Sequence, residues 1–599
     1  MSFLRRAEDV LASLTLLALM LLPLLEILVR RVSSAGLPGS GPFVLHLTLW
    51  VGFLGAALAA REGKLLALAT GTFIPEGRAR EIARTLSATV AAAVAMLLSM
   101  ASLELVLSER EAQTIIAVGV PVWVGQIVLP VSYALIAVRL VWGAGDRPWS
   151  RVAATAGLIA GYVVGQQPLL LEGLSPWPWI AIVLAAGALG APIFTILGGT
   201  AAMLFMSDGI TPAIVSIETY GLAVSPTLPA IPLFTLAGFL LAEGQASQRL
   251  LRLFRACFGW IPGGTAVVCA ALCSFFTVFT GGSGVTILAL GGLLFPALLR
   301  EGYRERFSLG LLTASGSLGL LLPPALPLIL FGIVAEIPIE DLFIGGILPG
   351  LLLTSLIAAW GVREGLVTGA GRSRFAMGEV WAAAWQAKWE LLMPVVVLVA
   401  LFSGLATLVE AAALTALYAL LVQVAVHRDL SVRADLLRVV AECVTLVGGV
   451  LIILGVAVGL TSYMVDAQVP MQLVAWAQDA IGSPLAFLLA LNVFLLIVGC
   501  LMDIFSAIVV VVPLILPLGQ VFGIHPVHLG IIFIANLELG YLTPPVGLNL
   551  FLASYRFERP LLEVSRAALP MLAILGVGVL LITYVPFLTL AILEALGRV

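Results

Sequence analysis

Long apolar runs, separated by short polar or basic segments, follow one another along the whole chain. Four runs in the first quarter are each long enough to cross a bilayer as a helix. They are predicted to form helices at about 10–30, 43–61, 83–107 and 120–142. The segment from Gly143 to Ser150 contains glycine, aspartate and proline and is predicted to be a linker before a further apolar helix at about 152–171. No alternating pattern typical of a barrel strand occurs, so we expect an all-α protein.

The composition favours a membrane protein. Of the 599 residues, 61% are apolar and 11% are charged. A soluble fold of this length could not bury so much apolar surface, and we therefore expect a chain that crosses the bilayer many times. Arg5 and Arg6 precede the first run, which is longer than a signal-peptide core and lacks a small-residue cleavage site. We expect this run to remain as the first helix.

Basic residues predict which loops face the cytoplasm. The loop after the second run carries Arg61, Lys64, Arg78, Arg80 and Arg84. A second basic cluster, Arg139, Arg147 and Arg151, follows the fourth run. Because cytoplasmic loops are enriched in lysine and arginine, we expect both loops and the N-terminus in the cytoplasm. Continued along the chain, the same rule predicts a single last helix at about 569–596 and places the C-terminus in the periplasm.

A segment in the middle of the chain recurs 221 positions later in altered form. The landmarks that share this offset are Gly319 to Pro324 with Gly540 to Pro545, Pro296 with Pro517, and Gly238 with Gly459. Landmarks in one register indicate a duplicated unit, at about 228–345 and 449–566. Each copy places a glycine and a proline pair inside an apolar segment, where they free backbone carbonyls from helical bonding. Paired breaks of this kind are typical of the binding site of a secondary transporter.

Each copy also contains a predicted helical hairpin. In the first copy, apolar limbs at about 263–279 and 285–299 flank the sequence Thr-Gly-Gly-Ser-Gly at 280–284. The six arginines around this hairpin are Arg249, Arg252, Arg255, Arg300, Arg304 and Arg306. The equivalent window in the second copy, 470–527, contains no lysine or arginine, and its tip is expected near 499–503. We therefore expect re-entrant hairpins that enter from opposite faces, as in an inverted repeat.

These motifs resemble those of the tripartite ATP-independent periplasmic (TRAP) transporters, in a form with fused small and large membrane subunits. The resemblance rests on Ile231 to Gly238, Phe275 to Ser283, Gly319 to Pro324, Gly404 to Ala413, Pro513 to Pro517 and Thr543 to Gly547, and more weakly on Trp50 to Leu66 and Gly119 to Trp123. The linkers then divide the chain into a small (Q-like) module at 1–150, a connecting helix and linker at 151–177, and a large (M-like) transport module at 178–599.

The resemblance implies an elevator-type, sodium-coupled importer in the bacterial inner membrane. Its substrate is implied to be a small organic anion, such as a carboxylate or sialic acid, which a separate periplasmic substrate-binding protein delivers. The small module is implied to brace the static scaffold. Two positions depart from the family pattern: the first hairpin tip is less serine-rich, and Lys64 stands where many small subunits have histidine. The sequence leaves the substrate, the sodium stoichiometry and the oligomeric state open, a homodimer included.

Candidate site residues follow from the need of sodium for hard oxygen donors, which broken helices and hydroxyl side chains supply. The first sodium site is predicted to use Thr277, Thr280, Gly319, Leu322 and Pro324. The resemblance implies a second, pseudo-symmetric site at Gly499, Gly540, Thr543 and Val546. Substrate is expected between the hairpin tips and the breaks, near Ser283, Asp503 and Asn549.

Structural explanations compete with these assignments. Glycine and threonine also serve helix packing in membranes, and Asp503 could equally hydrogen-bond the hairpin tip. Glu410 is expected to cap a helix that starts near Ala411, with a hinge role as the alternative. Glu218, Glu336 and Glu538 are expected near the membrane interfaces. His525 and His528 are expected in an ordinary outer loop, and the five cysteines, with no Cys-x-x-Cys pair, in structural positions.

A membrane-embedded enzyme and a stand-alone anion carrier are the alternative functions. A membrane-embedded enzyme is disfavoured, because the chain contains no His-Glu-x-x-His or Gly-x-Ser-x-Gly motif, no paired intramembrane aspartates and no phosphate-binding loop. We therefore predict no catalytic residues. A stand-alone ion-coupled anion carrier without a soluble receptor is the closer alternative, and the additional four-helix module argues against it.

Overall fold

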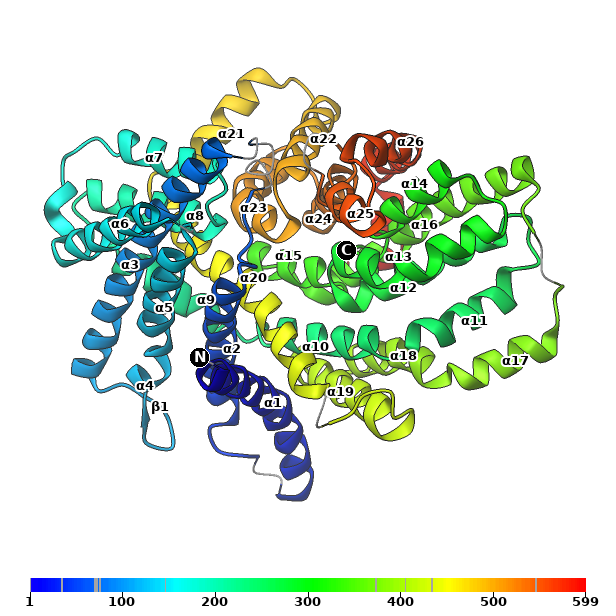
Figure 1. The fold of residues 1–599 in the computed structure, drawn as a ribbon, viewed down its shortest axis with the longest axis horizontal. Helices are drawn as coiled ribbons and strands as arrows, with labels where there is room; N and C mark the ends of the chain where they lie inside the picture. Colours follow the sequence, from blue (N-terminus) through cyan, green and yellow to red (C-terminus); the bar gives the residue numbers. More distant parts are fainter. Residues whose placement is uncertain are drawn as a thin grey trace. The chain divides into compact units, whose positions relative to one another are not determined.

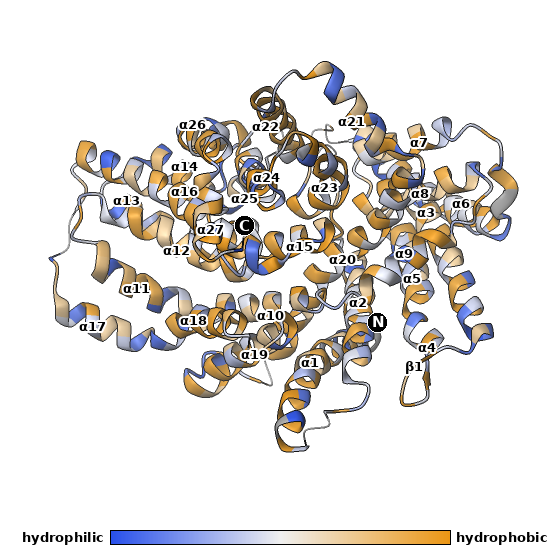
Figure 2. Ribbon diagram, turned by 180° about the vertical axis from the view of Figure 1, so that it is seen from behind, coloured by the Kyte–Doolittle hydropathy of each residue, from blue (hydrophilic) through white to orange (hydrophobic). Residues whose placement is uncertain are grey.

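A computed structural model describes residues 2–33, 36–68, 74, 77–145, 147–371, 374–404, 406–432, 435–544 and 547–598. Within them the chain is almost entirely helical (Figure 1), and apolar residues run along nearly every helix (Figure 2). Among these described residues, ten helices are long and apolar enough to cross a membrane, or up to twelve if two bent pairs are each one span. The predicted all-α, polytopic fold is confirmed.

The chain folds as two compact units. The first unit contains Met1–Leu233 and Val432–Val469, and the second contains Phe234–Ser431 and Pro470–Val599. Each unit is described by itself below.

The first unit contains the four predicted N-terminal spans and the helices that follow them. Its elements are α1 (Ser2–Ser33), α2 (Ser40–Glu62), α3 (Arg78–Ala112), β1 (Ile115–Ala117), β2 (Val120–Pro121), α4 (Val122–Gln126), α5 (Val128–Gly143), α6 (Pro148–Gln166), η2 (Pro168–Leu171), α7 (Trp177–Ala188), α8 (Ile193–Ser207), α9 (Ala213–Ala223) and α20 (Leu436–Asp466). The short antiparallel pair β1–β2 was not expected from the sequence. It turns at Val118 and Gly119, whose φ angles are 49° and 81°.

Close backbone contact and an ion cluster hold the first unit together. A Cβ added to Gly55 in α2 would lie 2.1 Å from the carbonyl oxygen of Val444 in α20, so only glycine permits this crossing. At one end of the bundle, Arg61 contacts Asp9 at 2.5 Å and Glu8 at 3.0 Å, and Arg139 contacts Glu8 at 2.5 Å. The start of α1, the end of α2 and the later part of α5 therefore meet.

The second unit contains both hairpins and both breaks. Its elements are α10 (Ala230–Glu243), α11 (Ala246–Phe258), α12 (Gly264–Thr280), α13 (Ser283–Arg300), α14 (Glu305–Ser315), α15 (Leu326–Ala335), α16 (Ile339–Thr368), α17 (Met377–Gln386), α18 (Lys388–Phe402), α19 (Leu408–Leu421), η3 (Val422–Val426), α21 (Val469–Ala480), α22 (Pro484–Leu501), α23 (Ile504–Val521), α24 (Pro526–Gly540), α25 (Leu548–Phe557), α26 (Leu561–Tyr584) and α27 (Phe587–Ala595). A few terminal residues of α10 and α21 belong to the first unit.

The two predicted helical hairpins are present. α12 and α13 form the first, with Gly281 and Gly282 between them, and α22 and α23 form the second, with Met502 and Asp503 between them. The prediction of a single last helix at about 569–596 was wrong, because α26 ends at Tyr584 and α27 begins after Pro586. Proline has no amide hydrogen to donate, so it ends one helix and starts the next.

The order of elements repeats along the chain, as the 221-residue offset predicts. In the first copy a helix pair (α10, α11) is followed by a hairpin, a helix (α14), a break and a second helix (α15). In the second copy α20 and α21 are followed by a hairpin, α24, a break and α25. The duplicated unit is therefore visible in the succession of helices.

The structural role expected for Glu410 is confirmed at the start of α19. The Thr407 side chain accepts a hydrogen bond from the Glu410 amide at 3.3 Å, and the Glu410 carboxylate accepts one from the Thr407 amide at 2.8 Å. This reciprocal capping box satisfies two amides that a helix start otherwise leaves unpaired.

Candidate ion and substrate site

The first break follows α14, where the chain turns instead of continuing as a helix. Short-range hydrogen bonds replace the helical pattern. The Leu320 amide donates to the Ser317 carbonyl oxygen at 3.0 Å, and the Leu322 amide donates to the Gly319 carbonyl oxygen at 3.1 Å. Pro323 and Pro324 have no amide hydrogen, so α15 begins only at Leu326. The predicted interruption is confirmed.

At Gly319 this break packs closely against the end of α12. A Cβ added to Gly319 would lie 2.2 Å from the carbonyl oxygen of Ser274 and 2.8 Å from the Cβ of Thr277. Both neighbours belong to α12, so any larger residue would push the break away from the hairpin. The Thr277 hydroxyl lies 2.8 Å from the Gly316 carbonyl oxygen, which ties hairpin and break together.

Three threonine hydroxyls gather at this contact. The Thr286 hydroxyl of α13 lies 2.8 Å from that of Thr277 and 3.3 Å from that of Thr280. All three side chains are buried. Together with the Gly316 carbonyl they form a compact set of hard oxygen donors, the type of group that sodium prefers. Thr286 was missed in the sequence analysis, because its position opposite Thr277 depends on how the second limb returns beside the first.

The remaining residues of the first predicted site lie in the same break but make other contacts. The Leu322 carbonyl accepts a hydrogen bond from the Ala325 amide at 3.0 Å, and the Leu322 side chain faces Gly350 of α16. Pro324 is buried, and its peptide bond with Pro323 is cis. The structure therefore places Thr277 against Gly319 and connects Thr277 with Thr280 through the Thr286 hydroxyl, whereas Leu322 takes part in the turn itself.

The second break lies against the end of α22 in the same manner. A Cβ added to Gly540 would lie 2.5 Å from the Cα of Gly499, so the two backbones touch. The Gly547 amide donates to the Cys500 carbonyl at 3.2 Å. Val546 lies outside the described residues, as does Pro545.

Backbone oxygens are also close together at the second break. The carbonyl oxygens of Tyr541 and Thr543 would lie 2.8 Å and 3.0 Å from a Cβ added to Gly547. The Thr543 hydroxyl donates a hydrogen bond to the carbonyl oxygen of Leu539, four residues earlier, at 3.0 Å. The hydroxyl hydrogen therefore points toward α24. Gly499 and Gly540 thus serve helix packing, and this packing also positions the break beside the second hairpin.

Asp503 caps the second limb of this hairpin. One carboxylate oxygen accepts hydrogen bonds from the Phe505 and Ser506 amides, both at 3.0 Å, and the other accepts one from the Ser506 hydroxyl at 2.6 Å. The Ile504 amide donates to the Tyr541 hydroxyl at 2.6 Å, which joins the tip to the second break. Of the two alternatives for Asp503, a functional acid or a hydrogen-bond acceptor at the hairpin tip, these contacts correspond to the second.

Asn549 connects the two repeats. Its side-chain amide donates to the Thr313 carbonyl at 3.1 Å and to the Ser317 hydroxyl at 3.4 Å, both beside the first break. Its Oδ1 atom is buried and accepts no hydrogen bond from the described residues, and the same holds for the hydroxyls of Ser283 and Ser315. Buried polar atoms without partners are uncommon, and here they leave acceptor and donor capacity for a ligand or water.

Glu538 is a buried acidic side chain close to the second break. It lies in α24, two residues before Gly540, and is 1% exposed, whereas we expected it near a membrane interface. Among the described residues neither carboxylate oxygen has a hydrogen-bond partner. An isolated buried carboxylate is costly, so it requires a proton or a cation. In the sequence, the feature that indicates a buried functional acid is the position of Glu538 inside an apolar run without any lysine or arginine.

The histidine pair offers no metal site. His525 caps α24 by accepting a hydrogen bond from the Val527 amide at 3.3 Å. His528 is buried within α24 rather than placed in a loop, and its ring contacts Thr589 at 3.1 Å and the Thr583 carbonyl at 3.2 Å. In the part of the chain that the structure describes, no group of three or more histidine, cysteine or acidic side chains could hold a metal ion.

Two family models match the chain. The description "Tripartite ATP-independent periplasmic transporter, DctM component" applies to residues 179–588. The description "Tripartite ATP-independent periplasmic transporters, DctQ component" applies to residues 19–144. The chain belongs to the tripartite ATP-independent periplasmic (TRAP) transporter family. The expected fusion of a small and a large TRAP membrane component is confirmed.

Known TRAP permeases are similar over much of the chain. The isethionate TRAP transporter permease protein DctMQ of Oleidesulfovibrio alaskensis is 34% identical over 490 residues, which cover 79% of this chain and 75% of that protein. The C4-dicarboxylate TRAP transporter large permease protein DctM of Pseudomonas aeruginosa is 34% identical over 401 residues, 67% of this chain and 93% of that protein. The ectoine TRAP transporter large permease protein TeaC of Halomonas elongata is 32% identical, covering 61% of this chain and 85% of that protein. These relatives are permeases rather than enzymes.

Proposed function

We propose that this TRAP permease imports a small organic anion together with sodium, by an elevator movement of the hairpins and breaks. The observation that carries the sodium part is the cluster of Thr277, Thr280 and Thr286 hydroxyls against the Gly316 carbonyl. Four uncharged oxygens in a buried position suit a hard monovalent cation such as sodium, which backbone carbonyls and hydroxyls coordinate.

The second break provides a further cation position. Glu538 is buried, lacks a partner among the described residues and precedes the carbonyls of Tyr541 and Thr543 by a few positions. A cation near this carboxylate would remove the cost of an uncompensated buried charge. We therefore place the second sodium ion at this break, where Glu538 supplies the negative charge.

The substrate is proposed to lie between the first hairpin tip and Asn549. Ser283 is the first residue of α13, and the amides at a helix N-terminus attract anions. The relatives are named for isethionate, C4-dicarboxylates and ectoine, all of which carry an acidic group. A carboxylate or sulfonate would accept from Ser283 and from the α13 amides.

We place the protein in the bacterial inner membrane, with a cytoplasmic N-terminus and a periplasmic C-terminus. A periplasmic substrate-binding protein is proposed to deliver the anion, in line with the family description. The alternative is a carrier that takes the anion directly from solution. Reconstituted uptake, with and without a periplasmic extract that contains substrate-binding proteins, distinguishes the two, because a receptor-independent carrier would transport equally in both cases.

Sodium binding is tested most simply on the purified protein without substrate. Thr277→Val keeps the shape of the side chain but removes the hydroxyl, and Thr415→Val is the matched control. Thr415 is a fully buried threonine of α19 whose hydroxyl, among the described residues, bonds to its own helix, at 2.7 Å from the Ala411 carbonyl. Sodium should raise the unfolding temperature of the native protein and of Thr415→Val more than potassium does. A tenfold weaker site in Thr277→Val would lower this stabilisation by about 1.4 kcal/mol at saturating sodium.

Two outcomes would count against the sodium proposal. Equal stabilisation by sodium and potassium would remove the evidence for a selective site. A sodium effect that survives unchanged in Thr277→Val and in Thr286→Val would place the ion elsewhere.

A further inference from the structure

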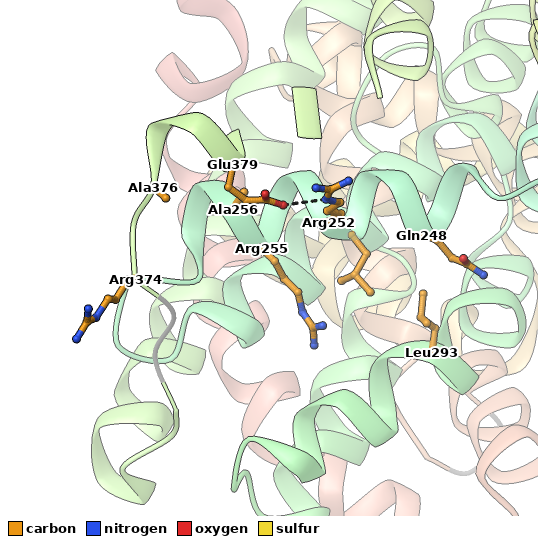
Figure 3. A pocket seen from close by; sticks show the side chains of 9 residues that line it. Gln248, Arg252, Arg255, Ala256, Leu293, Arg374, Ala376 and Glu379 are labelled. Atoms are coloured by element: carbon orange, nitrogen blue, oxygen red, sulfur yellow. Dashed lines mark hydrogen bonds and ion pairs between the residues drawn. The ribbon is translucent and has the colours of Figure 1, made fainter. Parts of the chain in front are cut away.

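A cleft of about 450 Å³ opens on the surface of the second unit, away from the hairpin tips and breaks. It lies between α11, the segment that enters α17, and α13 (Figure 3). Its lining includes none of the candidate sodium or substrate residues that the structure describes. Its polar lining is dominated by arginine: Arg252, Arg255 and Arg374 against one acid, Glu379.

The arginines of α11 differ in how completely nearby acidic side chains neutralise their charge. Arg249 is buried and is satisfied by Glu390 at 2.6 Å and Asp429 at 2.8 Å. Arg252 is paired with Glu379 at 2.8 Å. Arg255 has only a long contact to Glu301 at 3.5 Å, and its Nε atom is buried without a partner among the described residues. Figure 3 shows Arg255 extending from α11 toward the side of the cleft that carries Leu293.

The rest of the lining is apolar. Leu251 and Ala256 of α11 and Leu293 of α13 face the same cleft. Its volume lies in the range of sites that enclose a drug-sized molecule, which exceeds what one small inorganic anion fills. A ligand that fits must therefore carry a negative group for the arginines and apolar carbon for the leucines.

Exposed aromatic and apolar side chains surround the same elements. They are Trp260 (50% exposed), Phe375 (51%), Met377 (68%), Trp381 (72%) and Trp385 (62%). The rings of Trp260 and Phe375 meet edge to face at 6.1 Å, and the Lys388 ammonium lies 3.6 Å from the centre of the Trp385 ring. Tryptophan beside basic residues is typical of the headgroup level of a bilayer, where an amphipathic ring is partly wet.

We propose that this cleft binds the headgroup of an anionic phospholipid. The phosphate would accept hydrogen bonds from the guanidinium of Arg255, whose forked donors match its geometry, and Arg374 would add charge at the outer edge. The acyl chains would lie along Leu251 and Leu293 and out among the exposed tryptophans. The arginine-rich loops around α11 and α13 are those expected in the cytoplasm, where the membrane surface is negatively charged.

The proposed lipid site does not depend on sodium coupling or on the substrate. It joins α11 and the loop before α17 to α13, which is one limb of the first hairpin. A bound lipid would therefore stabilise the position of that limb.

The test is retention of phosphatidylglycerol by the purified full-length protein, measured by native mass spectrometry and by the unfolding temperature in nanodiscs. Nanodiscs of phosphatidylcholine alone, with or without phosphatidylglycerol, provide the comparison, and inorganic phosphate is added in a separate arm. The variants are Arg255→Gln and Arg374→Gln. Arg566→Gln is the charge-matched control, because Arg566 is an exposed arginine of α26 outside the cleft.

We expect phosphatidylglycerol to stay bound to the native protein and to Arg566→Gln, and its affinity to fall about tenfold in Arg255→Gln, since a charge-assisted hydrogen bond is lost. Arg374→Gln, at an exposed loop position, should give a smaller loss and keeps the test informative if Arg255→Gln folds poorly. Equal retention in the native protein and both cleft variants would overturn the proposal. So would equal stabilisation by inorganic phosphate without anionic lipid, which would indicate a site for free phosphate.

Discussion

Gly319→Ala should detach the first break from the first hairpin. The added methyl group would lie 2.2 Å from the Ser274 carbonyl and 2.8 Å from the Thr277 Cβ, and these atoms belong to a buried helix that cannot move aside freely. Overpacking of this kind costs about 1–3 kcal/mol. A shift that relieves it would lengthen the 2.8 Å contact between Thr277 and Gly316, worth about 1 kcal/mol more.

The assay is thermal unfolding of the purified protein in sodium and in choline chloride. We expect Gly319→Ala to lose about 2–4 kcal/mol of stability and nearly all of the sodium-dependent stabilisation. Gly221→Ala is the control, because Gly221 lies in α9 with nothing within 4 Å of the position of an added Cβ. That variant should be as stable as the native protein or slightly more so. If Gly319→Ala keeps both its stability and its sodium response, the docking of the break on α12 is not what forms the site.

Three further predictions concern the second repeat. Gly540→Ala should destabilise the protein by about 1–3 kcal/mol, because the methyl group would meet the backbone of Gly499, and unchanged thermal unfolding would contradict this. Asp503→Ala should lower the free energy of unfolding by about 0.5–2 kcal/mol, because the helix cap is lost. Asp503→Asn should keep most of the stability and the anion uptake. Loss of uptake in a stable Asp503→Asn variant would reveal a role beyond capping. Glu538→Gln should weaken sodium binding about tenfold without lowering stability in the absence of sodium, since an uncompensated buried charge is removed, and unaltered sodium titration would argue against the second cation position.

In the proposed sodium-coupled import, the number of sodium ions per anion decides how transport responds to voltage. Two sodium ions that enter with a monoanion move one net positive charge, which gains about 2.3 kcal/mol per 100 mV. Uptake into proteoliposomes should therefore rise sigmoidally with sodium and increase with an inside-negative potential. A hyperbolic sodium dependence without a voltage effect would indicate a different stoichiometry.

Much of the fold follows from local patterns. The limbs of the first hairpin, predicted at 263–279 and 285–299, lie at 264–280 and 283–300, because Gly281, with a φ angle of 63°, ends the first limb, whereas Gly284 is already part of the second. The missed split near Pro586 lies in an unbroken apolar run, where hydropathy carries no signal and only the proline marks the change of direction. The strands around Val118 were missed because a pair this short has no periodicity of its own.

The site was less accessible to sequence reasoning, since its residues meet only through tertiary contacts. Thr277 was chosen as a candidate because it lies beside a recognisable hairpin tip. Thr286 was not found, because its pairing with Thr277 depends on the angle at which α13 returns. Asn549 was identified from its place after the second proline pair, but its contact with Thr313 joins two repeats that are more than two hundred positions apart in the chain.

The central claim is that two hairpins, one from each repeat, reach the same site from opposite faces of the membrane. Labelling of single cysteines at the two tips, Gly282→Cys and Met502→Cys, in a chain without its five native cysteines tests this most directly. An impermeant thiol reagent should reach position 502 from the periplasmic side and position 282 from the cytoplasmic side, and sodium should slow both reactions. Labelling of both positions from one side, with no protection by sodium, would contradict the account.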